Sequence, residues 1–335
     1  MNFEMIGENL HCSRLVRLDG KHVRDNRFHY TDENGASRTM PVIPEFLDFS
    51  PAAKQGQLKQ VALAIFLIRS GNPAGFDFIR SAARRQLAAG AAYLDLNVDE
   101  YSSSPAEQEK AMEILVEATL GAGEKIPLSI DSSSPETLCT GVECAFPSGT
   151  PVLINSLSLK KPEMFDFAAN HHCRVIASAS GREAMETDLG TRLANLKELW
   201  GELVGRGIAA NDILLDPLVF PLSVEPSGGE QFFELLKECR AAFGDAVRFA
   251  PGLSNASFGL PLRRLINLVF LRRAIEAGCN GALIDPVSTT PEMALKLDPA
   301  DPAVAAAYKV VSGEDFYALD FVSLYHEGAF DGWKI

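Results

Sequence analysis

The chain has 335 residues, of which 47% are hydrophobic and 22% charged, so it can bury a large core and disorder is not expected. Its formal net charge of −13 argues against nucleic acid or an anionic membrane as a partner, since binding phosphate requires the opposite sign. The first residues lack the order of a signal peptide, and no apolar stretch reaches the roughly 18 residues that span a membrane. Six cysteines without a C-x-x-C pair predict reduced thiols and a cytoplasmic location.

The first 71 residues combine one strand with one irregular region. Residues 3–9 (FEMIGEN) predict a strand that ends in Glu8 and Asn9, and His11 and Cys12 follow it. In residues 13–71, the dipeptides Asp19-Gly20 and Asn34-Gly35 are typical of hairpin turns, and a helix is expected over residues 52–68. We therefore expect an inserted hairpin excursion, which could be a lid, a surface that docks a partner or a structural cap.

From residue 72 onward, helical and strand patterns alternate. Further strands are expected over residues 92–97, 127–131, 151–155, 174–180, 213–216, 247–255 and 281–285. Helices are expected over residues 72–89, 105–120, 135–145, 161–171, 189–206, 229–243 and 261–277, with a helical tail at 291–335. This alternation predicts a single domain over residues 1–335, a (β/α)8 barrel of the TIM type. An open doubly wound sheet would need a G-x-G-x-x-G loop after the first strand, which the sequence lacks.

Most of the expected strands end in a carboxylate or a carboxamide. Any one such residue could be a turn or a helix cap, but a whole series indicates a polar pocket, because the carboxyl ends of barrel strands share one rim. A carboxamide both donates and accepts hydrogen bonds, which suits the amide-like edge of a flat heterocycle. No H-x-H or His/His/carboxylate motif occurs, so a catalytic zinc is not expected, whereas Mg²⁺ on Asp131 and Asp216 stays open. Cys12 beside His11 has the ingredients of a thiol–imidazole pair, but no orienting residue can be named.

Five segments carry a resemblance to a known family. They are LDLNV at 94–98, SIDSS at 129–133, LINS at 153–156, LLDPL at 214–218 and GLSNASFGLP at 252–261. In order and spacing they resemble the pterin-binding barrel family over roughly residues 72–290. Within it, the chain looks most similar to methyltetrahydrofolate:corrinoid methyltransferases and to the folate module of cobalamin-dependent methionine synthase. The excursion at 13–71 is longer than this family leads us to expect.

The resemblance implies roles for particular residues. The pterin edge would be bound by Asp131, Asn155 and Asp216, and Asn255 would lie close to N5 as the catalytic residue. The other expected substrate-binding residues are Asp95, Asn97, Glu8, Ser178 and Arg263. Arg263 could reach the glutamate tail of a folate or a partner protein, or it could form an ion pair at the start of a helix. No metal ligand is expected.

The resemblance also implies an activity and its alternatives. The expected reaction moves a methyl group between N5 of tetrahydrofolate (5-methyltetrahydrofolate when methylated) and the cobalt of cobalamin, a corrinoid. Because the chain has no D-x-H-x-x-G corrinoid motif, a partner corrinoid protein would carry the cobalamin. A homodimer is expected from the resemblance alone. Dihydropteroate synthase is the alternative enzyme, but residues 97–108 (NVDEYSSSPAEQ) lack its Arg- and Gly-containing diphosphate loop. A non-catalytic pterin-binding module is the other alternative, and the direction of transfer and the choice of folate or methanopterin stay open.

Overall fold

The computed structural model describes residues 3–183 and 187–333, and the chain divides into two compact units. One unit is Met1–Ile6 with Ser156–Ile335, and the other is Gly7–Asn155. We call them the C-terminal unit and the N-terminal unit. The prediction of a single domain over residues 1–335 stays a prediction.

The main sheet has eight strands in the order of an α/β barrel. The strands are β1 (Glu4–His11), β7 (Tyr93–Asn97), β8 (Leu128–Asp131), β9 (Val152–Leu157), β10 (Arg174–Ser178), β11 (Ile213–Asp216), β12 (Arg248–Phe249) and β13 (Gly281–Ile284). Their hydrogen-bonded order is β12-β11-β10-β9-β8-β7-β1-β13. A parallel bridge between Gly252 and Leu283 joins the chain after β12 to β13, which stands at the other end of this order. The predicted (β/α)8 fold class is confirmed.

In the N-terminal unit, three helices cover β7 and β8, and a fourth packs on two of these helices. These helices are α2 (Gln60–Arg69), α3 (Ala74–Ala88), α4 (Pro105–Leu120) and α5 (Pro135–Ala145). Ser134 caps α5 by accepting a hydrogen bond from the Thr137 N–H, and Pro135 occupies the first turn, where no intrahelical donor is lost. A Cβ on Gly141 would come within 2.5 Å of Ile130, so a glycine is needed for α5 to approach β8 this closely.

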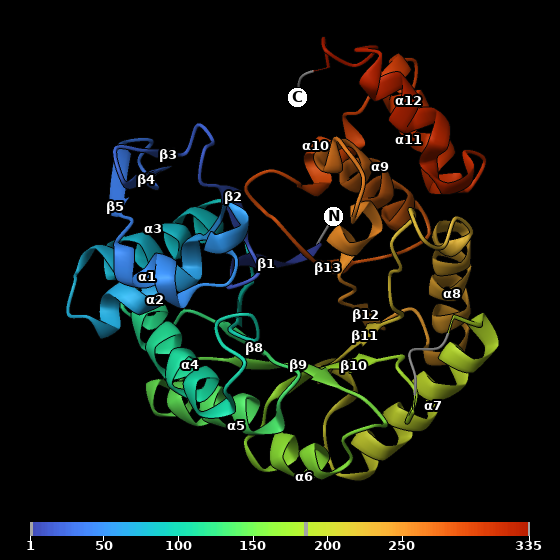
Figure 1. The fold of residues 1–335 in the computed structure, drawn as a ribbon. Coiled ribbons are helices and arrows are strands. Elements are labelled where there is room, and N and C mark those ends of the chain that lie inside the picture. The colour runs from blue at the N-terminus through green and yellow to red at the C-terminus, as the bar shows by residue number, and fades with distance from the viewer. Residues whose placement is uncertain (1–2, 184–186, 334–335) are drawn as a thin grey trace. The chain divides into compact units, whose positions relative to one another are not determined.

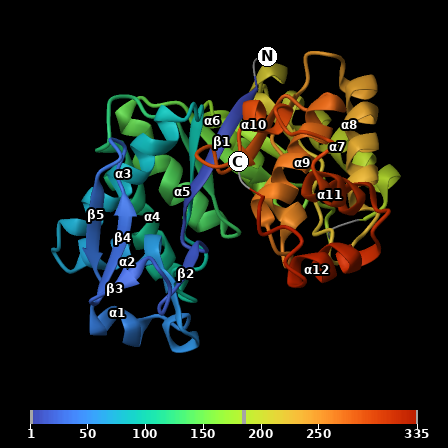
Figure 2. The same cartoon turned by 90° about the horizontal axis from the view of Figure 1, so that it is seen from above.

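The excursion contains a three-stranded antiparallel sheet that lies beside α3 (Figure 2). Its strands are β3 (Val23–Arg24), β4 (Arg27–Thr31) and β5 (Ser37–Pro41). The rings of Phe28 and Tyr30 pack edge-on against Phe78 of α3, with centroids 5.7 and 5.1 Å away. The predicted turn at Asn34-Gly35 is confirmed, since β4 and β5 pair on either side of it.

Two predictions within the excursion are wrong. Asp19-Gly20 does not join a hairpin, because β2 (Leu15–Arg17) pairs with the distant β6 (Gln57–Lys59). The tight hairpin turn lies instead at Asp25 and Asn26, both with φ of +52°. The helix expected over residues 52–68 starts only at Gln60, because β6 occupies the preceding residues.

In the C-terminal unit, helices again cover the strands, and the predicted helical tail is present. The helices are α6 (Glu163–Asn170), α7 (Leu189–Gly205), α8 (Gly228–Phe243), α9 (Arg263–Glu276), α10 (Pro291–Leu295), α11 (Pro302–Ser312) and α12 (Leu319–His326). Figure 1 shows α11 beside α8 and α9. The strand predicted over 247–255 is too long, because β12 is Arg248–Phe249 and a 3₁₀ helix, η4 (Leu253–Ser257), follows Pro251. Among the described residues, no helix has the length and apolarity to cross a membrane.

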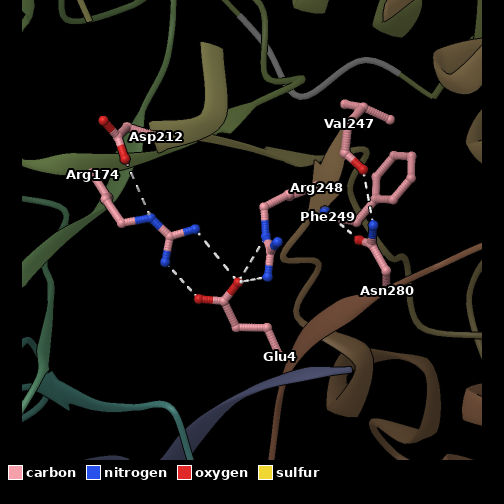
Figure 3. A network of polar contacts seen from close by, with 7 residues as sticks. All are labelled: Glu4, Arg174, Asp212, Val247, Arg248, Phe249 and Asn280. Carbon is pink, nitrogen blue, oxygen red and sulfur yellow. Dashed lines mark hydrogen bonds and ion pairs between the residues drawn. The ribbon is translucent and has the colours of Figure 1, made fainter. Parts of the chain in front are cut away.

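The amino ends of three strands in the C-terminal unit meet in a buried ion-pair network (Figure 3). Glu4 of β1 is 8% exposed and accepts from Arg174 of β10 at 2.5 Å and from Arg248 of β12 at 2.6 Å. Burial by itself would raise the pKa of Glu4, but the hydrogen bonds and charges of Arg174 and Arg248 lower it overall. Glu4 is therefore an ionised residue that ties three strands together.

Glu4→Gln should lower the free energy of unfolding at neutral pH by about 2–4 kcal/mol, because it leaves two partly buried guanidinium groups without their counterion. Urea denaturation measures the change. Since the pKa of Glu4 is lowered on folding, its contribution is present above its unfolded pKa and is lost as pH falls through the folded value.

The control is Asp19→Asn, which breaks an ion pair with Arg17 whose side chains are 70% and 76% exposed. It should leave stability unchanged, because an exposed pair contributes little. Equal stability of Glu4→Gln and the parent protein would contradict the proposed role of Glu4.

Candidate functional site

Strand register places polar side chains at one level in the N-terminal unit. Asn97 of β7 pairs with Asp131 of β8, and Asp131 pairs with Asn155 of β9. Paired residues of neighbouring strands point to the same face, and Asp95 shares that face because it precedes Asn97 by two residues. Four polar residues are therefore gathered at the carboxyl ends of three strands, as predicted for a rim.

His11 completes this group, which we call the His11 cluster: His11, Asp95, Asn97, Asp131 and Asn155. β1 neighbours β7 in the sheet, so His11 at the end of β1 reaches Asp95, with 2.7 Å between Nε2 and Oδ2. The Asn155 Nδ2 donates to the other oxygen of Asp95 at 3.2 Å. The Asn97 Nδ2 donates to Asp131 at 2.9 Å. Asp95 is fully buried and uses both oxygens within the cluster.

Two members of the cluster, His11 and Asp131, have raised pKa values and so keep their protons to higher pH. Burial and the neighbouring charge of Asp95 raise the pKa of Asp131, against the opposing effects of His11 and Asn97. Burial by itself would lower the pKa of His11, but Asp95, with Asp131 and Glu8, raises it overall. The chemical consequence is an imidazole that holds its proton more readily than a free one, beside a carboxyl, Asp131, that ionises late. Such a group can exchange a proton when a ligand with N–H donors arrives.

One His and two carboxylates of the cluster also lie close enough to share a metal ion. The ligand atoms of His11, Asp95 and Asp131 are within 4.8 Å of one another. Sequence motifs did not reveal this trio, because its members come from three different strands. In the structure the His11–Asp95 and Asn97–Asp131 hydrogen bonds already use these groups, which favours holding a proton over holding a cation.

Two further residues near the end of β1 have structural partners. Glu8 lies 3.8 Å from Arg14. Cys12 is fully buried, and burial raises the pKa of its thiol. Because the His11 imidazole pairs with Asp95 and not with Cys12, the structure does not support a thiol–imidazole pair.

In the C-terminal unit, the register pairs Ser178 at the end of β10 with Asp216 at the end of β11. The Asp216 Oδ1 accepts a hydrogen bond from the Leu218 N–H at 2.9 Å. Burial raises the pKa of Asp216 to about 6, although this N–H and the charge of Arg192 oppose the rise. Ionisation of Asp216 is therefore less favourable in the folded protein than in the unfolded chain.

Asn255 lies in η4 and is exposed. Among the described residues, none forms a hydrogen bond with the Asn255 carboxamide. A side chain at position 252 would crowd it, since a Cβ added to Gly252 would lie 3.1 Å from the Asn255 Nδ2. Arg263, the first residue of α9, braces this loop by donating to the Ser257 Oγ at 3.0 Å and to the Ser254 carbonyl at 2.9 Å. The loop is held in place while the Asn255 amide stays available to a ligand.

Sequence reasoning missed the roles of His11 and Arg192. The contact of His11 follows from strand order, which local patterns do not give. Arg192 is fully buried on α7 in line with Leu196, Leu199 and Leu203, so an arginine in an apolar stripe was a readable signal.

Asp216→Asn should stabilise the protein above pH 6. The raised pKa of Asp216 means that ionisation opposes folding as pH rises from about 4 to above 6, whereas an Asn can still accept from Leu218. The expected gain is up to about 2–3 kcal/mol at pH 8 and near zero at pH 4, measured by urea denaturation. The exposed Asp245 provides the control, Asp245→Asn, with no expected gain. If the Asp216→Asn variant is no more stable than the parent at pH 8, ionisation of Asp216 does not reduce the free energy of unfolding.

Relatives of known activity match most of this core. A methylcorrinoid:tetrahydrofolate methyltransferase of Eubacterium limosum is 30% identical over 218 residues, which cover 63% of this chain and 77% of that protein. A methionine synthase of Mycobacterium tuberculosis is 28% identical over 230 residues, covering 63% of this chain and 19% of that longer protein.

Solved structures support the fold. A dihydropteroate synthase of Yersinia pestis, solved with a pterine-sulfa conjugate, superposes with a TM-score of 0.52 at 22% identity, covering 66% of this chain and 87% of that one. The enzyme of Xanthomonas albilineans in complex with 7,8-dihydropteroate gives 0.52 at 18% identity, covering 66% and 83%. At these identities the likeness concerns the fold alone.

The family itself is established by a direct match over more than half of the sequence. The family model of pterin binding enzymes covers residues 70–285, which span β7 to the end of β13 and include the strand-end residues Asp131, Asn155 and Asp216. The chain therefore belongs to the pterin binding enzyme family.

Proposed function

We propose that the chain is a methyltransferase that moves a methyl group between N5 of tetrahydrofolate and the cobalt of a corrinoid protein. The observation that carries the proposal is the exposed, uncommitted carboxamide of Asn255 on a loop braced by Arg263. The Eubacterium limosum relative, named for methyl transfer between a corrinoid and tetrahydrofolate, supports the reaction class. We place the protein in the cytoplasm and expect a homodimer, which sedimentation analysis would test.

Asp131 and Asn155 are proposed to hold the pyrimidine edge of the pterin. An ionised Asp131 would accept N–H bonds from the ring, and the Asn155 carboxamide can donate and accept. Because the pKa of Asp131 is raised, ligand binding would draw a proton from this carboxyl, which could pass to another member of the His11 cluster or to solvent. Asn97 orients Asp131 through its hydrogen bond, and the fully buried Asp95 acts through His11 and Asn155.

Asp216 is proposed as a second acceptor for the pterin, with Ser178 beside it in register. Glu8 and Arg263 complete the proposed binding residues. Arg263 donates to the loop of Asn255, so we propose that it acts first by positioning that loop.

The chemistry centres on a proton at N5. A methyl group on N5 of tetrahydrofolate leaves poorly, because the departing nitrogen would carry negative charge. Asn255 would hydrogen-bond N5 and stabilise a proton there as the methyl group leaves, with water delivering the proton. In the opposite direction the carboxamide oxygen would accept a hydrogen bond from the N5–H, and water would take up the proton as the nitrogen gains the methyl group. The reduced corrinoid of the partner protein would supply the methyl acceptor.

The loop after β7 argues against dihydropteroate synthase chemistry. Asp99 accepts from the Ser132 Oγ at 2.5 Å and from the Ser133 N–H at 2.8 Å, which ties this loop to the one after β8. An acidic side chain in this position would repel a diphosphate leaving group.

The test is an anaerobic spectral assay with methyltetrahydrofolate and cob(I)alamin. We expect protein-dependent loss of the cob(I) absorbance with formation of methylcobalamin. Folate binding by calorimetry without turnover would point to a strict need for the cognate corrinoid protein or to a non-catalytic module. Absence of folate binding would refute the proposal, and formation of dihydropteroate from a pterin diphosphate and p-aminobenzoate would establish the alternative.

Asn255→Ala should lower the rate of methyl transfer by about 100-fold while changing folate affinity less than about fivefold, because its hydrogen bond forms mainly in the transition state. Single-turnover kinetics and calorimetry measure the two effects. The matched variant is Asp131→Ala, which should weaken folate binding first. Equal losses of rate and affinity in Asn255→Ala would mean that Asn255 only binds the ligand.

A further inference from the structure

Arg192 of α7 is a buried cation in an apolar environment. It is the largest of the fully buried side chains and lies in line with Leu196, Leu199 and Leu203. Burying a guanidinium among leucines is unfavourable unless its hydrogen bonds and charge are used. This residue therefore needs an explanation beyond packing.

The contacts of Arg192 converge on the turn that follows Asp216. Its Nη1 donates to the carbonyls of Pro217 at 3.2 Å and Leu218 at 3.4 Å. Its Nη2 donates to Gln231 Oε1 of α8 at 3.4 Å, and the guanidinium lies over the Phe220 ring at 5.5 Å. Within the part of the chain that the structure describes, Nε has no hydrogen-bond partner, and the hydrogen bonds of the other two nitrogens go to neutral carbonyl and carboxamide oxygens. The positive charge of Arg192 is therefore available to act on carboxylates that it does not contact directly.

The turn itself is held in an uncommon conformation. Leu218 has a φ of +66°, a region that leucine rarely adopts. Its N–H donates to the Asp216 Oδ1 at 2.9 Å, and its carbonyl accepts from Arg192. Asp216 and Arg192 therefore fix the same residue through its two backbone groups.

Titratable groups on several elements lie within electrostatic range of Arg192 and Asp216. Arg192 interacts with Asp188 at the start of its own helix, with Asp216 after β11, with Glu225 before α8 and with Cys239 on α8. Burial lowers the pKa of Arg192, and these groups oppose the fall. For Asp216, burial raises the pKa to about 6, and Arg192 is the cation that opposes the rise. Cys279 also lies within electrostatic range of Asp216.

We propose that Arg192 is a positioning residue that fixes the 216–218 turn and couples its buried charge to the Asp216 carboxylate, which would accept N–H donors of the ligand. The role for the ligand rests on the proposed function, which assigns Asp216 to the pterin. The charge coupling between Arg192 and Asp216 does not depend on that assignment.

The first measurement is the titration of the Asp216 carboxyl by ¹³C NMR of aspartate-labelled protein, assigned with Asp216→Asn. Arg192→Met should move the midpoint upward by about one pH unit from the parent value near 6, because the nearby opposite charge is removed. Arg192→Lys keeps a charge and should move it by less than half as much. An unchanged midpoint in Arg192→Met would overturn the proposal, and if that variant does not fold, an unchanged midpoint in the equally uncharged Arg192→Gln overturns it.

The matched control is Arg240→Met. Arg240 of α8 also donates to backbone carbonyls, those of Gly278 and Asp245, and lies over the Phe249 ring. Its removal should destabilise the protein locally without moving the titration of Asp216. A shift as large as that of Arg192→Met would attribute the effect to general loosening of the unit and overturn the assignment.

The second measurement is folate affinity as a function of pH. Arg192→Met should bind at least fivefold more weakly at pH 6.5 and recover most of the loss at pH 8.5, where Asp216 ionises without help. A loss that is equal at all pH values would indicate a structural role only. If Asp216→Asn leaves folate binding unchanged, Asp216 does not bind the pterin and that part of the proposed function is wrong. The NMR midpoints still decide whether Arg192 is coupled to Asp216.

Discussion

The parallel register of β7, β8 and β9 is the constraint on which the candidate site depends. It aligns Asn97 with Asp131 and Asp131 with Asn155, so residues far apart in the sequence become neighbours on one face. A slip of one residue would turn these side chains to the opposite face, where helices cover the sheet. The same pairing places Asp95 where it can bond His11 and Asn155 at once. The apolar residues that alternate with them hold this register and, through it, the site.

The pKa values of carboxyl groups at the two ends of the strands are shifted in opposite directions. At the amino ends, Glu4 has two arginine partners, and its pKa is lowered because their bonds outweigh burial. At the carboxyl ends, burial prevails and raises the pKa of both Asp131 and Asp216. The first arrangement contributes stability, whereas the second reduces it even though Asp131 accepts from Asn97 and Asp216 from the Leu218 N–H. This contrast separates a structural ion pair from a candidate binding site on physical grounds.

Elements with local end signals could be predicted from the sequence, and those that depend on distant pairing could not. The bounds of α4 and α5 match the prediction, because each begins with a serine and a proline, and one of them ends at a glycine. The hairpin at Asp19-Gly20 failed because the partner of β2 is β6, about forty residues further along. The strand predicted to reach residue 255 stops at Phe249, since Pro251 cannot donate to the sheet and the chain turns into η4. The candidate rim residues were predictable as strand ends, but the bond between His11 and Asp95 required the neighbourhood of β1 and β7.

Arg192 shows how a local exception in a pattern can point to function. The stripe of Leu196, Leu199 and Leu203 predicts a helix face packed on the sheet. Arg192, four residues before Leu196 on the same face, departs from that pattern. The fold accommodates the cation by giving it two carbonyl acceptors next to Asp216 and a residue, Leu218, in a strained conformation. A leucine in its place would pack at lower cost but would leave the carbonyls of Pro217 and Leu218 without this donor and remove the cation near Asp216. The proposed role of Arg192 thus accounts for a buried arginine in this stripe, because a cation at this position both holds the turn after β11 and opposes the rise in the pKa of Asp216.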